Sequence, residues 1–193
     1  SCPLHTSGRG GGGGLKGANR GKKGGHNIGA DVLRGFNTLI DSNLRFSQTE
    51  AAYTLLDRLN ESATRGQSAP ADVYTYTILI QNMTPGLSAP KQARDVYDQM
   101  LNAGVRGDQT FFNCTLEVLI KSRDFLSAAD AFDVARREAV APFDSCLSLS
   151  ATTARLDMHG FPRAAAAAAL EWVLRMDPSG STPEREAGGR EGG

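Results

Sequence analysis

Four copies of one apolar stripe constrain the fold of this chain more than any other feature of its sequence. In each copy an alanine is followed by apolar residues four and seven positions later. This spacing puts all three side chains on one face of a helix. We therefore expect four helices with similar buried faces, and the alanine lets a neighbouring helix approach closely. The copies are Ala52–Leu56–Leu59, Ala93–Tyr97–Met100, Ala128–Phe132–Ala135 and Ala169–Val173–Met176.

A second recurring segment precedes each stripe. The segments begin at Phe36, Tyr76, Phe112 and, more weakly, Leu147, which lie 40, 36 and 35 residues apart. Each unit is therefore predicted to form two helices, and a helix pair with one apolar face buries that face by stacking on another pair. The sequence predicts an all-α fold, an α-solenoid of about 3.5 to 4 stacked antiparallel helix pairs, near the minimum of about three that such an array needs.

Start and stop signals give the expected helix bounds. In the second unit Pro85 and Gly86 separate two helices, Pro90 suits a first helical turn, and Gly104 ends the second helix. In the third unit Ser127 is expected to cap the second helix. No segment shows a convincing strand alternation, and the fourth pair is expected to open near Leu147. The other helices are expected at 32–43, 49–62, 74–82, 88–102, 108–121, 127–139 and 164–176.

Composition divides the chain into three segments. Residues 1–30 hold 11 of the 22 glycines and five cations without an acid, so we expect a disordered basic segment. Residues 177–193 are also expected to be disordered. Residues 31–176 hold nearly all the aliphatic residues, with 14 basic and 17 acidic side chains, and form the expected helical array. Five cations on a flexible chain are predicted to attract a polyanion without sequence preference.

Charge, hydropathy and motif content exclude several classes of function. The 21 cations balance the 21 acids, which argues against a uniformly basic wrapper of nucleic acid. No apolar run approaches the length of about 20 residues that spans a membrane. Cys2, Cys114 and Cys146 make neither a disulfide framework nor a CxxC pair. We expect no catalytic constellation, no metal site and no cofactor, and hence a protein that is not an enzyme.

The second unit resembles the pentatricopeptide repeat (PPR) family. The resemblance rests on Val73-Tyr74-Thr75-Tyr76-Thr77-Ile78-Leu79-Ile80, followed by Ala93, Tyr97 and Met100 and by a turn from Ala103 to Asp108. It covers roughly residues 32–176, and the fourth unit matches poorly. The competing tetratricopeptide pattern has a W-x2-L-G-x2-Y opening that is absent here. The chain resembles a fragment or a short member of the PPR family.

The resemblance implies binding of single-stranded RNA, one base per unit. It assigns Asn37 with Asp72 to uracil and Thr77 with Asp108 to guanine. Asn113 is the third reader, but Phe143 stands where its acidic partner is expected, and Tyr74 offers the best surface for stacking between bases. Asp72 and Asp108 also suit helix N-caps, and the two roles are compatible.

The resemblance further implies a role in RNA processing, stability, editing or translation in a mitochondrion or chloroplast. Other organellar RNA-processing or ribosomal proteins are possible partners. An α-solenoid scaffold for proteins, for example a ribosome-associated subunit, is the first alternative, because the folded segment has a net charge of −3. The second alternative is the RNA-binding part of a larger enzyme resembling protein-only ribonuclease P.

Overall fold

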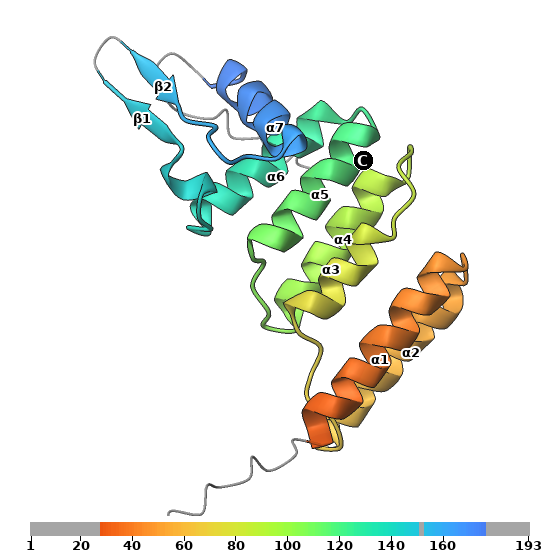
Figure 1. Cartoon of the computed structure of the whole chain (residues 1–193). Helices are drawn as coiled ribbons and strands as arrows, with labels where there is room; N and C mark the ends of the chain where they lie inside the picture. Colours follow the sequence, from red (N-terminus) through yellow and green to blue (C-terminus); the bar gives the residue numbers. More distant parts are fainter. Residues whose placement is uncertain (1–27, 151–152, 177–193) are drawn as a thin grey trace, which may run out of the picture.

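The computed structural model describes residues 28–150 and 153–176, and this part of the chain is mostly helical (Figure 1). The predicted disordered segments lie outside it, except that Ile28–Ala30 form the first turn of a helix. The helices are α1 (Ile28–Arg45), α2 (Thr49–Thr64), α3 (Val73–Gln81), α4 (Ala89–Asn102), α5 (Gln109–Lys121), α6 (Phe125–Arg137) and α7 (Arg163–Leu174). Each helix here is too short or too polar to span a bilayer.

The first six helices form three antiparallel pairs, as the repeats predicted (Figure 1). Helix α1 packs on α2, α3 on α4, and α5 on α6, while the odd-numbered helices also pack on one another in order. Two of the predicted stripes are fully buried, Ala52–Leu56–Leu59 in α2 and Ala128–Phe132–Ala135 in α6, whereas Tyr97 of the second stripe and Val173 and Met176 of the fourth are half-buried. In α2 and α6 the repeated stripe is therefore the face that packs against the rest of the array.

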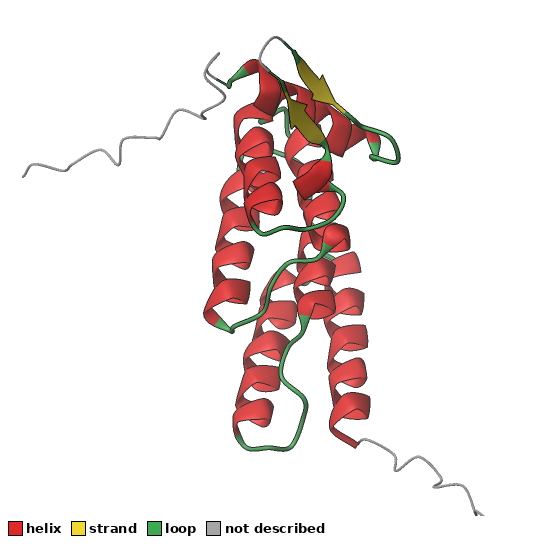
Figure 2. Cartoon of the chain, turned by 90° about the vertical axis from the view of Figure 1, so that its left-hand side faces the viewer, coloured by secondary structure: helices red, strands yellow, loops and turns green. Residues whose placement is uncertain are grey.

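The predicted fourth helix pair is wrong. After a short 3-10 turn (Phe143–Ser145), strand β1 (Leu147–Leu149) pairs antiparallel with β2 (Ala154–Leu156), in the register Leu147 to Leu156. Figure 2 shows these strands at one end of the helical array. The physical reason is the alternation of leucine and serine over 147–150, a period of two that suits a strand and not a helix.

Helix α7 extends the row of odd-numbered helices instead of completing a fourth pair. It packs on both α5 and α6. Trp172, at 3% exposed, donates a hydrogen bond from Nε1 to Asp133 Oδ1 at 3.1 Å, and Arg136 stacks on the indole at 4.2 Å from the ring centre. The described array therefore holds three helix pairs and one further helix.

Aspartates set the N-termini of three helices. Asp72 and Asp108 cap α3 and α5, as predicted, by accepting hydrogen bonds from backbone N–H groups three residues later. The cap of α6 differs from the prediction: Asp124 accepts from the Ser127 N–H at 3.0 Å, so the helix begins at Phe125. Gly104 ends α4 with φ of +73°, as its sequence position indicated.

Candidate nucleic-acid interface

A hollow of about 470 Å³ lies between α1 and the start of α3. Three of the six predicted RNA-binding residues line it. Asn37 comes from α1, Asp72 is the cap of α3, and Tyr74 stands in the first turn of α3. Three residues that the PPR resemblance implied for RNA contact thus come from two consecutive helix pairs and lie around one hollow. The full lining is Leu33, Arg34, Asn37, Thr38, Asp41, Asp72 and Tyr74.

Hydrogen bonds connect the side chains at the bottom of this hollow. Asp72 Oδ1 accepts from the Thr75 N–H at 3.0 Å, and Thr75 Oγ1 donates to Asn37 Oδ1 at 2.9 Å. Asn37 is only 5% exposed. Since its oxygen is occupied, the hydrogen-bonding group that Asn37 can offer a ligand is its NH2, which makes no hydrogen bond within the described residues.

The rim of the hollow combines an aromatic surface with mixed charge. Tyr74 is 60% exposed, so its ring is open to a stacking partner. Arg34 pairs with Asp31 along α1, and Asp41 pairs with Arg45 at 2.9 Å. One cation and two carboxylates thus line the site, so it has little net attraction for phosphate. The arrangement suits contact with a base more than contact with a phosphate backbone.

Thr77 and Asp108, the second predicted pair of RNA-reading residues, do not line a common hollow. Thr77 is 3% exposed, and its hydroxyl donates to the Val73 carbonyl at 2.8 Å. Asp108 caps α5 by accepting from the Phe111 N–H at 2.8 Å. Neither residue lines the hollow between α1 and α3 or the groove described below. The structure therefore places Thr77 beneath the surface, with its hydroxyl engaged inside its own helix.

The third reader, Asn113, lies half-buried in α5. Its Oδ1 is buried and has no hydrogen-bond partner within the described residues. Phe143, at the place of the expected acid, is fully buried and packs edge-on against Phe112 and Phe132, with ring centres 6.3 and 5.6 Å away. The departure seen in the sequence thus has a structural role, because the turn supplies an aromatic core residue in place of a carboxylate.

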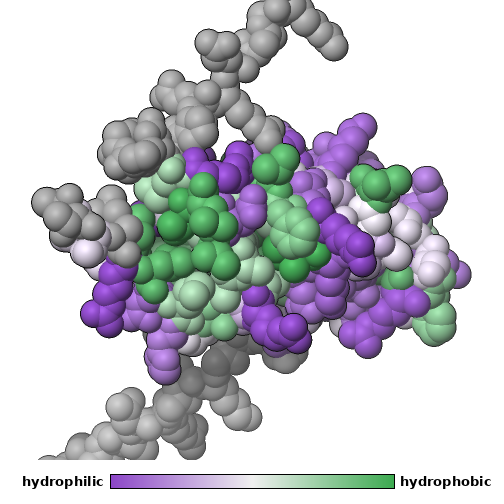
Figure 3. All heavy atoms as spheres, turned by 90° about the horizontal axis from the view of Figure 1, so that it is seen from above, coloured by the Kyte–Doolittle hydropathy of each residue, from purple (hydrophilic) through white to green (hydrophobic). Residues whose placement is uncertain are grey.

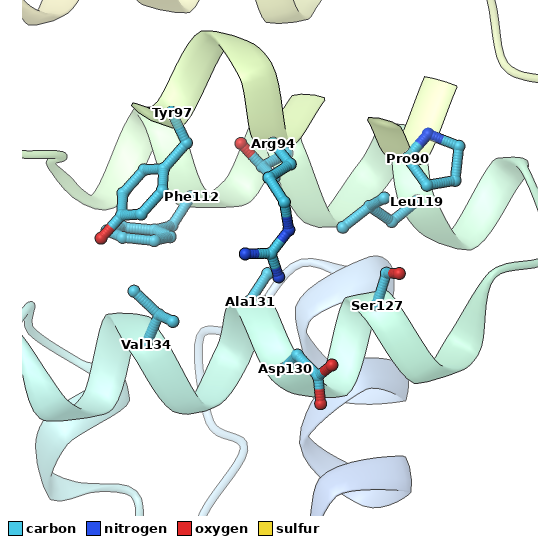
Figure 4. A pocket seen from close by; sticks show the side chains of 10 residues that line it. Pro90, Arg94, Tyr97, Phe112, Leu119, Ser127, Asp130, Ala131 and Val134 are labelled. Carbon is cyan, nitrogen blue, oxygen red and sulfur yellow. The ribbon is translucent and has the colours of Figure 1, made fainter. Parts of the chain in front are cut away.

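A groove that sequence analysis missed lies between α4 and α6, with α5 as its floor (Figure 4). It has a volume of about 80 Å³. Arg94 reaches from α4 across its middle toward Ala131 of α6 (Figure 4). No sequence signal marks it, because three separate helices supply the walls. The lining is Pro90, Arg94, Tyr97, Phe112, Thr115, Leu119, Ser127, Asp130, Ala131 and Val134.

The two cysteines of the described residues are both buried or half-buried. Burial raises the pKa of the Cys114 and Cys146 thiols, which disfavours the reactive thiolate. Burial and a hydrogen bond to Glu138 raise the pKa of Tyr97. Within this part of the chain no group of His, Cys, Asp and Glu side chains is placed to hold a metal ion.

No protein-family model and no curated protein matches this chain.

Proposed function

We propose that this protein binds single-stranded RNA and that a base enters the hollow between α1 and α3. The supporting observation is that Asn37, Asp72 and Tyr74, which the PPR resemblance implied for RNA contact, line one hollow. They offer an NH2 donor, a carboxylate and an exposed aromatic ring. Hydrogen bonding to a base edge together with aromatic stacking is how single-stranded RNA is generally bound.

Uracil is the proposed base at this site. The Asn37 NH2 group complements a carbonyl oxygen of uracil, and the PPR resemblance assigns the same base to the pair Asn37 and Asp72. Asp72 Oδ1 is held by the start of α3. This leaves Oδ2 to accept a hydrogen bond from a ligand or to orient the base. A role in organellar RNA processing, stability, editing or translation, in a mitochondrion or chloroplast, rests on the resemblance.

A binding titration with the full chain tests this proposal. The probes are fluorescent single-stranded RNAs of equal length, one rich in uracil and one rich in adenine. Tyr74→Ala should weaken binding by about five- to hundredfold, because a stacked base contributes about 1–3 kcal/mol. Leu87→Ala is the matched control, since Leu87 is a fully exposed apolar side chain outside the hollow. Equal affinities for wild type and Tyr74→Ala would reject this site.

A protein scaffold is the second candidate, and the groove between α4 and α6 favours it. The groove joins the apolar side chains of Phe112, Leu119 and Val134 with the cation of Arg94 and with Asp130, whose carboxylate pairs with Arg175 at 3.1 Å. That combination suits an apolar anchor residue next to an acidic one on a protein partner. The two candidates are separable: Arg94→Glu should abolish such binding and leave the affinity for RNA unchanged, whereas Tyr74→Ala should do the reverse.

A further inference from the structure

The outer face of α7 is an apolar surface that no described residue covers. Leu170 is 51% exposed and Leu174 is 72% exposed. With Ala167 they lie on one face, because they follow one another at intervals of three and four residues. Figure 3 looks down on the end of the molecule that carries α7 and shows a continuous hydrophobic area there. The opposite face of α7 is the buried one and contains Ala165, Ala168, Ala169 and Trp172.

The position of α7 in the array explains why this face is open. Helix α3 packs on α1, α5 packs on α3, and α7 packs on α5. The outer face of α7 is thus the place that another helix of the row would occupy. Residues 177–193 contain no Val, Ile, Leu, Met or aromatic residue, and residues 1–27 contain two leucines, Leu4 and Leu15.

Two kinds of residue are spaced symmetrically about Ala167 on this face. Leu170 and Ala164 each lie three positions from it, and Glu171 and Arg163 each lie four positions from it. At three positions from Ala167 a large side chain on one side thus corresponds to a small one on the other, and at four positions an acid corresponds to a base. Arg163 and Glu171 are eight residues apart, or about 12 Å along the helix, so they cannot pair within one copy. Neither makes an ion pair with any other described residue.

We propose that this face binds the same face of a second copy, with the two α7 helices antiparallel across a two-fold axis at Ala167. The small Ala167 side chains let the helices approach closely. Leu170 then packs on Ala164 of the partner subunit, and Glu171 pairs with Arg163 of the partner subunit. Each contact occurs twice, as an isologous interface requires. The acid and the base at equal distances from Ala167 are complementary between two antiparallel copies, so a second copy is the occupant that the charges of α7 favour.

The oligomeric state of the full chain tests this proposal. An interface of one helix per subunit is small, so sedimentation should show a monomer–dimer equilibrium with a Kd in the micromolar range, roughly 1–100 µM. Leu170→Glu should weaken dimerisation by at least about tenfold, because it places a charge three residues from the two-fold axis, and Leu174→Glu should weaken it less, because Leu174 lies seven residues from the axis. Leu87→Glu, a fully exposed site away from α7, should dimerise like wild type. Circular dichroism checks that every variant is folded.

A charge exchange tests the antiparallel register. Glu171→Arg should weaken the dimer, because it brings two cations together on each side of the axis. Combining it with Arg163→Glu should restore wild-type dimerisation, since both pairs are re-formed with exchanged signs. A wild-type monomer at all concentrations, a dimer unaffected by Leu170→Glu, growth beyond dimers, or failure of the double variant to recover would each overturn the proposal.

Discussion

Thr75 Oγ1 of α3 donates a hydrogen bond to Asn37 Oδ1 of α1 at 2.9 Å, and both residues are buried. They are 38 positions apart in the sequence, one in each of the first two helix pairs. The same Thr75 forms the capping box with Asp72. One threonine therefore sets the start of α3, joins two repeats and fixes the amide that lines the hollow.

Thr75→Val should destabilise the fold, because it leaves the buried Asn37 oxygen without its donor and removes the Thr75 hydroxyl from the capping box of α3. Losing the partner of a buried polar group costs about 1–3 kcal/mol. Thr54→Val is the control: the Thr54 hydroxyl is exposed and bonds within its own helix, to Glu50 O at 2.9 Å. Urea unfolding followed by circular dichroism measures both variants. Equal losses in the two variants would contradict a special role for the Thr75–Asn37 bond.

The three helix pairs could be predicted from the sequence because their signal is local. The stripe of Ala128, Phe132 and Ala135 has helical spacing by itself, and its repetition fixes the phase of the array. The segment 147–150 carries two patterns at once: it fits the repeated opening, and it alternates with a period of two. Repetition favoured a helix, but pairing with 154–156 produces a hairpin.

The candidate site could be predicted only in part, for a similar reason. The resemblance placed Asn37, Asp72 and Tyr74 at matching positions of consecutive units, and these three residues line one hollow. It does not give how deeply a face is buried. Thr77 lies on α3, which packs between α1 and α5, and that packing covers it. Burial of this kind depends on contacts between distant segments, so no local pattern reveals it.

Gly107 should not tolerate alanine. A Cβ atom at Gly107 would lie 2.8 Å from Cε2 of Phe112, a ring that is itself 2% exposed and cannot move aside. Overpacking of this kind costs about 1–3 kcal/mol. Gly35→Ala is the opposite case: no atom lies within 4 Å of the added methyl group. Because Gly35 lies inside α1, that change should stabilise the protein by up to about 1 kcal/mol. Chemical denaturation should give opposite signs for the two variants.

Ala139→Gly should stabilise the protein. Ala139 follows α6 with φ of 56°, a left-handed conformation that costs an L-residue about 1–2 kcal/mol and glycine almost nothing. Gly104, which follows α4 with φ of 73°, is its natural counterpart. Both positions donate a backbone hydrogen bond to the residue three positions earlier. Gly104→Ala should therefore lower the free energy of unfolding by about as much as Ala139→Gly raises it. Thermal melts check this, and a change of the same sign in both variants would refute it.

Tyr97 should make stability depend on pH in the alkaline range. Its phenol is partly buried and donates a hydrogen bond to Glu138, and both effects raise its pKa above the ordinary value of 10.0. The unfolded chain therefore loses this proton at a lower pH than the folded protein does. The contribution of the Tyr97 phenol to the free energy of unfolding is fully present below pH 10 and is lost as the pH rises beyond it.

The free energy of unfolding of wild type should thus fall more steeply between about pH 9.5 and 11 than that of Tyr97→Phe, by up to about 1 kcal/mol. Tyr53, Tyr76, Cys114 and Cys146, whose pKa values are also raised by burial, are present in both proteins, so the difference isolates Tyr97. Parallel pH profiles for the two proteins would show that Tyr97 ionises alike in the folded and unfolded states.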